Sequence, residues 1–154
     1  MNILLTGHKG FIGSALFTRL ERAGHKVQGI DIEAGWDRDK LYSDQNLLDC
    51  ILPKDIDLVI HLAGKSGVRE SLKDPASYWN NNVEASRRLF EHYEGTRILY
   101  ASSSSAYEPD LNPYAASKFI LEELAERYGR DIVHYKCHSE LHKAVKNFIP
   151  DKKE

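Results

Sequence analysis

Three glycines stand near the start of the chain, at the junction between a short apolar run and a helical pattern. Gly7, Gly10 and Gly13 recur at every third residue, in the order G-x-x-G-x-x-G. Residues 2–6 before the first glycine are mostly apolar, and residues 14–23 repeat apolar side chains at helical spacing. A strand, a tight glycine turn and a helix in this order direct backbone N–H groups and the positive end of a helix dipole at one point. The pattern therefore predicts an α/β fold with a dinucleotide pyrophosphate site at this turn.

The rest of the chain alternates between strand-like and helical segments. Strands are expected at residues 2–6, 26–32, 47–48, 57–63, 97–101 and 132–137, and helices at 14–23, 50–52, 76–93, 114–128 and 139–149. The polar segment 33–45 indicates a surface loop. Strands that alternate with helices favour right-handed crossovers and a parallel sheet covered on both faces. The expected fold class is α/β, a Rossmann-type doubly wound parallel sheet in a single domain, with its core in residues 1–137 and a closing helix and tail in 138–154.

Composition excludes several classes of partner. A formal net charge of -2 over 154 residues gives no electrostatic reason to expect nucleic acid or an anionic membrane surface. No apolar stretch approaches the ~20 residues of a membrane span. Cys50 and Cys137 are too few for a disulfide framework, and the first apolar run ends at once in Thr6 and Gly7, unlike a signal peptide. We therefore expect a cytoplasmic protein.

An acidic residue ends the second expected strand. Asp31 follows the glycine turn at about 20 residues, where a carboxylate can accept hydrogen bonds from both hydroxyls of a ribose. It repels a 2′-phosphate, and residues 29–33 contain no lysine or arginine that would bind one. The position favours NAD over NADP as the cofactor, and a solvated loop carboxylate is the alternative interpretation.

A tyrosine and a lysine four residues apart open the helix expected at 114–128. Tyr114 and Lys118 share one face of that helix, and an ammonium group there stabilises the ionised tyrosine for proton exchange with a substrate hydroxyl. The spacing by itself is a weak signal and far more often marks a solvated pair. However, the strand before it runs into the serines at 102–105, at the edge of the sheet where ligands bind in open α/β folds. A serine hydroxyl there can hold the substrate oxygen, although a polar strand exit is the alternative for the serines alone.

These motifs together resemble the extended short-chain dehydrogenase/reductases, the NAD-dependent epimerase/dehydratase family that acts on nucleotide sugars. The matching stretches are T-G-x-x-G-F-I-G at 6–13, N-L-L-D at 46–49, D-L-V-I-H-L-A-G at 57–64, G-V-R-E-S at 67–71, P-x-x-Y-x-x-N-N-V at 75–83, S-S-S-S-A-Y at 102–107 and N-P-Y-A-A-S-K at 112–118. The resemblance implies an epimerase, dehydratase or reductase with a small-molecule substrate such as a nucleotide sugar. It also implies a homodimer paired through the two long helices at 76–93 and 114–128.

The resemblance also assigns roles to single residues. Tyr114 would be the catalytic acid-base, Lys118 would bind the nicotinamide ribose, and Ser103 would be the catalytic serine, with Ser104 as the nearby alternative. The cofactor-binding residues implied are Gly7, Lys9, Gly10, Phe11, Ile12, Gly13, Asp31, Ile32, Asn46, Leu47, Leu62, Ala63, Gly64, Asn82, Ala101, Ser102, Tyr114 and Lys118.

The chain departs from the family pattern in three places. Asn46 stands where the family usually has aspartate, and Glu108 follows Tyr107 where the family usually has glycine and a longer loop. The family's chain continues into a domain that grips the substrate nucleotide, and we expect no separate substrate domain here. Two alternatives to a self-contained enzyme therefore stay open: an NAD-binding module without turnover, and an enzyme that borrows its substrate wall from a neighbouring subunit.

The histidines near the C-terminus do not predict a metal site. His134, His138 and His142 recur at every fourth residue, with Cys137 between the first two. The first of them falls on an expected strand, where side chains alternate between faces, so the three do not share one helical face. We expect no metal.

Overall fold

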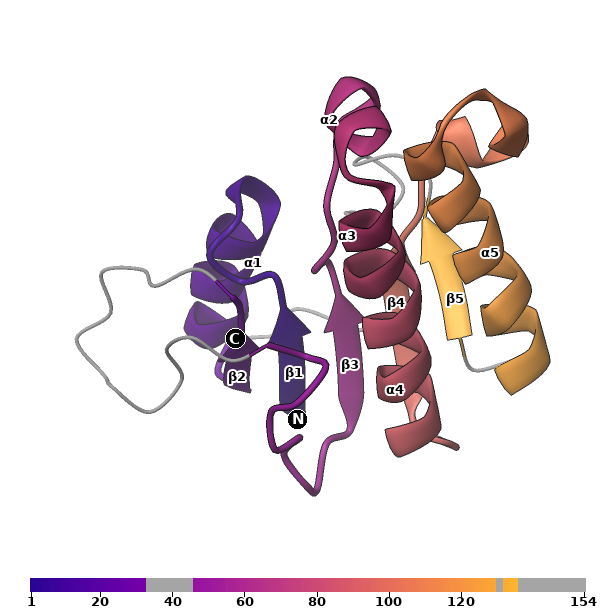
Figure 1. The fold of residues 1–154 in the computed structure, drawn as a ribbon. Helices are drawn as coiled ribbons and strands as arrows, with labels where there is room; N and C mark the ends of the chain where they lie inside the picture. Colours follow the sequence, from indigo (N-terminus) through magenta and orange to yellow (C-terminus); the bar gives the residue numbers. More distant parts are fainter. Residues whose placement is uncertain (33–45, 130–131, 136–154) are drawn as a thin grey trace.

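Five parallel strands form one sheet in the computed structural model, which describes residues 1–32, 46–129 and 132–135 (Figure 1). The strands are β1 (Asn2–Thr6), β2 (Lys26–Ile30), β3 (Leu58–His61), β4 (Arg97–Ala101) and β5 (Ile132–Tyr135). Their order is β2-β1-β3-β4-β5, and β1 pairs with both β2 and β3. The chain moves outward from β1 to β2 and then returns to the other side of β1. The switch point of this sheet, where open α/β folds bind ligands, therefore lies between β1 and β3.

Helices cover both faces of the sheet (Figure 1). They are α1 (Phe11–Arg22), α2 (Val68–Lys73), α3 (Pro75–Trp79), α4 (Ala85–His92) and α5 (Pro113–Tyr128), with a π-helical segment η1 (Asn80–Glu84) and two 3₁₀ turns, η2 (Ser104–Tyr107) and η3 (Pro109–Leu111). Within the described residues, no helix is long and apolar enough to span a membrane.

Successive residues of β1 show how the two layers arise. Leu4 packs in the cluster that α4 and α5 complete with Leu89 and Leu121. Ile3 and Leu5 point to the other face and pack with Leu20 of α1. All three β1 side chains are fully buried, because neighbouring residues of a strand face opposite sides and both sides are covered. The expected Rossmann-type doubly wound sheet is thus confirmed.

The start of α5 is set by two residues that precede Tyr114. The side chain of Asn112 accepts a hydrogen bond from the Ala115 N–H at 2.9 Å, which satisfies one of the free donors of the first turn. Pro113 occupies the first helical position, where its missing N–H costs nothing. Both features place Tyr114 and Lys118 in the first turns of α5.

The expected third strand at 47–48 and the expected short helix at 50–52 are both wrong. Residues 47–49 form a turn in which the Asn46 carboxamide accepts a hydrogen bond from the Leu48 N–H at 3.0 Å. The Asn46 carbonyl also accepts from the Cys50 N–H at 2.8 Å. A polar side chain that bonds its own following backbone competes with strand pairing, and here the turn prevails.

The helix expected at 76–93 is interrupted in its middle. It consists of α3, the π-helical η1 and α4, which follow one another as a single rod (Figure 1). In η1 the Ala85 N–H bonds the Asn80 carbonyl five residues earlier, and this extra residue turns Asn82 and Val83 into the interior. The sequence did not indicate α2, and α1 begins at Phe11 rather than at residue 14.

Other boundaries differ by a few residues. The strands β2 and β3 are shorter than the expected 26–32 and 57–63, and β5 spans the described part of 132–137. The strand expected at 97–101 is confirmed. The loop at 33–45, the closing helix at 139–149 and the cluster of Cys137, His138 and His142 lie outside the described residues.

Candidate active site

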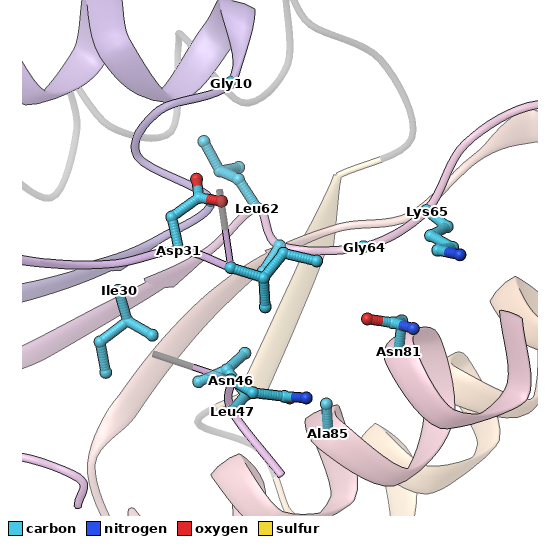
Figure 2. A pocket seen from close by; sticks show the side chains of 13 residues that line it. Gly10, Ile30, Asp31, Asn46, Leu47, Leu62, Gly64, Lys65, Asn81 and Ala85 are labelled. Carbon is cyan, nitrogen blue, oxygen red and sulfur yellow. The ribbon is translucent and has the colours of Figure 1, made fainter. Parts of the chain in front are cut away.

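A cavity of about 350 Å³ opens at the carboxyl ends of β1, β2 and β3 (Figure 2). Its lining residues are Gly7, Gly10, Ile30, Asp31, Ile32, Asn46, Leu47, Leu62, Ala63, Gly64, Lys65, Asn81 and Ala85. Figure 2 shows Asp31 and Lys65 toward opposite ends of this space, with the apolar side chain of Leu62 near Asp31. The cavity therefore lies at the switch point of the sheet and carries opposite charges at its two ends.

The glycine turn forms one wall of this cavity and has no room for side chains. A Cβ on Gly13 would lie 2.0 Å from the Gly7 carbonyl oxygen, and one on Gly7 would lie 2.7 Å from the Ala63 nitrogen. Gly7 also has a φ of 72°, which side-chain-bearing residues rarely adopt. The turn therefore lies directly against the end of β3, and α1 begins immediately after it. No side chain of the described residues caps the first turn of α1. This cradle fits a pyrophosphate.

Asp31 is fixed at the edge of the cavity by the glycine turn itself. The Lys9 N–H donates to its carboxylate at 2.9 Å. This bond ties the end of β2 to the turn and holds the carboxylate toward the cavity that it lines. The position fits the ribose of a dinucleotide whose pyrophosphate lies on the turn.

The wall of the cavity opposite the glycine turn includes the turn at residues 46–49, which a side chain of α4 holds in place. Arg88 donates to the carbonyl of Leu47 through one guanidinium nitrogen and to that of Cys50, at 2.7 Å, through the other. Further along, the Tyr93 hydroxyl donates to the Pro53 carbonyl at 2.7 Å. The cavity-lining residues Asn46 and Leu47 therefore owe their placement to side chains of α4 and of the residue that ends it.

The predicted catalytic residues gather where β4 ends against the start of α5. Ser103 caps the start of η2 and accepts a hydrogen bond from the Ser105 N–H at 3.2 Å, and η2 packs on α5. The Tyr114 ring packs edge to face on Tyr78, with centroids 6.3 Å apart. The buried Lys118 donates from Nζ to the Ala101 carbonyl at 3.0 Å. The structure thus brings the three predicted residues to one edge of the sheet.

Lys118 lies directly behind the cavity wall. A Cβ on Gly64 would be 3.6 Å from its Nζ and 3.0 Å from the Asn82 carboxamide oxygen, so both groups lie just behind the glycine that lines the cavity. Burial lowers the pKa of Lys118 to about 8, and the nearby carboxylate of Glu122 opposes that shift. The ammonium group is therefore present at neutral pH and is lost as the pH rises through about 8.

A chain of hydrogen-bonded polar side chains links the loop after β3 to the start of α5. The Asn82 carboxamide accepts from the Lys65 N–H at 2.7 Å and donates to Ser117 Oγ at 3.0 Å. Ser117 in turn donates to the Tyr114 carbonyl at 2.7 Å. The π-helical η1 is what brings Asn82 into this position, so the loop after β3 and the first turn of α5 are held by one side chain.

His61 continues this network toward β1. Ser86 Oγ donates to the Asn82 carbonyl at 2.8 Å, so it accepts from His61 Nε2 at 2.7 Å. His61 Nδ1 then accepts from Thr6 Oγ1 at 2.6 Å, and Thr6 accepts from the Ala63 N–H. The hydroxyls of Ser86 and Thr6 thus each donate one hydrogen bond and accept one. This pattern defines His61 as the neutral tautomer with its proton on Nε2. Burial, helped by the charge of Lys118, lowers the pKa of His61 to about 3.

The neutral state of His61 predicts how stability depends on pH. Its folded pKa of about 3 lies below the ordinary value of 6.5, so the unfolded chain binds one more proton between these values. We expect stability to fall as the pH is lowered from about 6.5, by about 1.4 kcal/mol per pH unit from this group. Urea unfolding between pH 7 and pH 5 measures it. His61→Gln should flatten the slope, whereas His92→Gln, at an exposed histidine, should keep it; the same slope in both variants would contradict the assignment.

The cavity contains only part of the predicted cofactor set. The predicted residues that line it are Gly7, Gly10, Asp31, Ile32, Asn46, Leu47, Leu62, Ala63 and Gly64. The others, which are not in its lining, are Lys9, Phe11, Ile12, Gly13, Asn82, Ala101, Ser102, Tyr114 and Lys118. Gly13 and Lys9 support the glycine turn, whereas Phe11 is 93% exposed at the start of α1.

Sequence reasoning missed four lining residues. Ile30, Lys65, Asn81 and Ala85 line the cavity but were not selected. Asn81 and Ala85 lie one helical turn apart, and the first belongs to the N-N pair of the 75–83 motif, which was a usable signal. Lys65 is held by Ser77 and lies 5.9 Å from the centre of the Tyr78 ring. No local pattern marked it, because its contacts come from α3.

A family model for the NAD dependent epimerase/dehydratase family matches residues 3–137, most of the chain. The chain belongs to that family. The resemblance drawn from the motifs is therefore confirmed, and NAD is the family's cofactor, as predicted.

Curated relatives of the family are about 30% identical to this chain. The UDP-glucose 4-epimerase of Halalkalibacterium halodurans is 32% identical, with 86% of this chain and 49% of the relative covered. Protein CapI of Staphylococcus aureus is 30% identical, with 84% and 50% covered. The chain thus spans about half the length of the curated relatives it matches.

Solved structures show the same fold with cofactor or substrate bound. MoeE5 in complex with UDP-glucuronic acid and NAD is 34% identical with a TM-score of 0.71, covering 87% of this chain and 52% of MoeE5. The UDP-glucuronic acid 4-epimerase from Bacillus cereus in complex with NAD is 28% identical with a TM-score of 0.73, covering 88% and 56%. Solved structures of similar fold therefore include proteins bound to NAD and one that holds a nucleotide sugar as well.

Proposed function

We propose that this chain binds NAD and takes part in hydride transfer at a carbon–oxygen bond of a nucleotide sugar, as an epimerase, dehydratase or reductase. The observation that carries the proposal is the position of Lys118. Its ammonium group lies immediately behind Gly64 in the cavity wall and donates to the Ala101 carbonyl, two residues before Ser103, and Lys118 belongs to the same helix as Tyr114. The dinucleotide cavity and the Ser-Tyr-Lys set are thus parts of one site.

The residues of the cavity fit NAD in a defined direction. The glycine turn and the start of α1 would hold the pyrophosphate, Asp31 would hold the ribose of the adenosine half, and the turn at Asn46 and Leu47 would border the adenine. Lys118 and Asn82, on the far side of Gly64, would hold the nicotinamide half. NAD bound in this way supplies the acceptor and donor of a hydride.

The side chains of this chain handle the proton of the same reaction. The ionised Tyr114 oxygen would accept the proton of the substrate hydroxyl as the hydrogen on the attached carbon leaves with its electron pair, and the resulting phenol would return the proton in the reverse step. The Ser103 hydroxyl donates to the substrate oxygen and fixes its position. The Lys118 ammonium stabilises the ionised form of Tyr114, because an adjacent positive charge favours the phenolate.

Nucleotide sugars are the proposed substrate class because relatives of similar fold bind or convert them. MoeE5 is seen with UDP-glucose and with UDP-glucuronic acid. We test the proposal with NAD and a panel of nucleotide sugars, following the absorbance of reduced nicotinamide and the isomeric products. Turnover of at least one sugar is the expected result. NAD binding with no turnover of any sugar would instead support an NAD-binding module.

We also propose a cytoplasmic homodimer for the whole protein. The rod of α3, η1 and α4 lies beside α5 (Figure 1). Trp79 and Phe119, which belong to these helices, are 45% and 39% exposed. Pairing of two copies through these helices would cover both rings, as in a symmetric helical interface.

Asp31 is expected to select NAD against NADP. Asp31→Asn keeps an acceptor for the Lys9 N–H but removes the charge that repels a 2′-phosphate. The ratio of NAD to NADP affinity should therefore fall by about tenfold or more, because like charges in contact are costly. Calorimetric titration of both dinucleotides measures this ratio. Asp49→Asn, at an exposed carboxylate near the same wall, is the control, and equal wild-type affinity for the two dinucleotides would refute the role.

A further inference from the structure

Two side chains of α5 hold two consecutive residues at the end of β4. Lys118 donates from Nζ to the Ala101 carbonyl at 3.0 Å. Glu122, one helical turn later, accepts a hydrogen bond from Ser102 Oγ. The next residue is Ser103, and the residue one turn before Lys118 is Tyr114. The two contacts therefore set the distance between the serine and the tyrosine of the proposed site.

We propose that Glu122 is a positioning residue of the Ser103–Tyr114–Lys118 site, which holds the end of β4 through Ser102 and keeps the positive charge on Lys118. Its effect on turnover rests on the proposed function, whereas its effect on Lys118 does not. Glu122 is not among the residues that line the cavity, and it acts on the site through Ser102 and Lys118.

The charges around Lys118 support this role. Burial lowers the pKa of the lysine to about 8, and the Glu122 carboxylate is the charge that raises it. His61, which faces it from β3, is neutral because burial lowers its pKa. The Tyr100 phenol of β4 is also neutral, since burial and then the charges of Glu122 and Glu126 raise its pKa.

Other polar side chains near Lys118, in the part of the chain that the structure describes, carry no fixed charge. Asn82 and Ser117 are uncharged amide and hydroxyl groups, and the Tyr114 phenol belongs to the site itself. Without Glu122, the buried ammonium would retain its desolvation cost and lose its favourable charge partner. A larger fraction of Lys118 would then be uncharged at working pH.

The test follows the protonation of Lys118 directly in the intact protein. NMR titration of the lysine side chains, with Lys118→Arg used to assign the signal, gives the midpoint without NAD or substrate. Glu122→Gln keeps an oxygen acceptor for Ser102 but removes the charge. Glu122→Asp keeps the charge, and Glu123→Gln makes the same neutralisation at the adjacent, exposed residue.

We expect the midpoint to fall in Glu122→Gln, to remain closer to the wild-type value in Glu122→Asp, and to be unchanged in Glu123→Gln. NAD affinity at pH 8 should fall about three- to tenfold in Glu122→Gln and recover at lower pH. An unchanged midpoint in Glu122→Gln, or an equal fall in Glu122→Asp or Glu123→Gln, would overturn the proposal.

Two further measurements keep the test decisive. If Glu122→Gln does not fold, Ser102→Ala releases the carboxylate from its partner and must also lower the midpoint; an unchanged midpoint overturns the proposal. If the enzyme turns over, the pH above which turnover declines should move with the midpoint. Absence of turnover in the wild type would contradict the proposed function and leave the Lys118 titration as an independent test.

Discussion

Replacing Tyr114 with phenylalanine is expected to lower turnover of a nucleotide sugar by ~10²–10⁴-fold and to leave NAD affinity nearly unchanged. The substitution removes one hydroxyl, the group proposed to exchange the proton. The phenyl ring can keep its edge-to-face contact with Tyr78, whose own hydroxyl is held by the Ser66 carbonyl at 2.7 Å. Binding and chemistry should therefore separate, and kcat measured beside a calorimetric NAD titration will show it.

The matched control is Tyr128→Phe at the other end of the same helix. That hydroxyl donates to the exposed Glu91 carboxylate at 2.8 Å, remote from Tyr114, and its loss should leave turnover unaffected. Turnover that survives Tyr114→Phe would show that another group moves the proton. A large loss of NAD affinity in the same variant would instead assign Tyr114 a binding role.

Replacing Gly13 with alanine is expected to abolish the dinucleotide site. The new Cβ would lie 2.0 Å from the Gly7 carbonyl oxygen and 2.8 Å from the His8 Cα, both of them backbone atoms. Neither can move without shifting the turn proposed to hold the pyrophosphate. We expect NAD affinity to fall at least ~100-fold and the free energy of unfolding to fall by about 3 kcal/mol or more. Urea unfolding and NAD titration measure the two effects.

Gly10→Ala is the matched control, because it separates the effect on NAD affinity from the effect on the free energy of unfolding. A Cβ there meets only the Gly7 carbonyl oxygen, at 3.3 Å, and the backbone φ of −68° is one that alanine adopts freely. Its stability should therefore remain within about 1 kcal/mol of wild type. Because Gly10 lines the cavity, its NAD affinity can still fall. Equal stability of the two alanine variants would contradict the close packing derived for Gly13.

The features that could be predicted from the sequence are those set by local patterns. The glycine turn, β1 and the start of α5 follow from residues that are neighbours in the chain. Tyr114 and Lys118 were found because a spacing of four places them on one face of a helix. Matching motifs then supplied Ser103, whose role still depends on the Tyr114 experiment.

The features that could not be predicted depend on distant contacts. The turn at Leu47 is held by Arg88, which lies 41 residues away in the sequence. No property of residues 47–52 indicates that this hydrogen bond forms. The π-helical η1 adds one residue to a turn, which helical periodicity does not register, and it decides where Asn82 points. His61 looked like an ordinary member of an apolar strand, yet its role comes from Thr6 and Ser86 on two other elements.

One measurement asks directly whether the cavity and the Ser-Tyr-Lys set form a single NAD-linked site. The protein is incubated with NAD and with UDP-glucose or UDP-glucuronic acid deuterated at every sugar carbon, the reaction is stopped with alkali during turnover so that reduced nicotinamide is preserved, and mass spectrometry follows deuterium in that reduced form. We expect label to appear with the wild type and to be reduced ~10²-fold or more in Tyr114→Phe. Label that appears equally in both proteins, or NAD that binds without acquiring label from either sugar or any other nucleotide sugar tested, would contradict the proposed function.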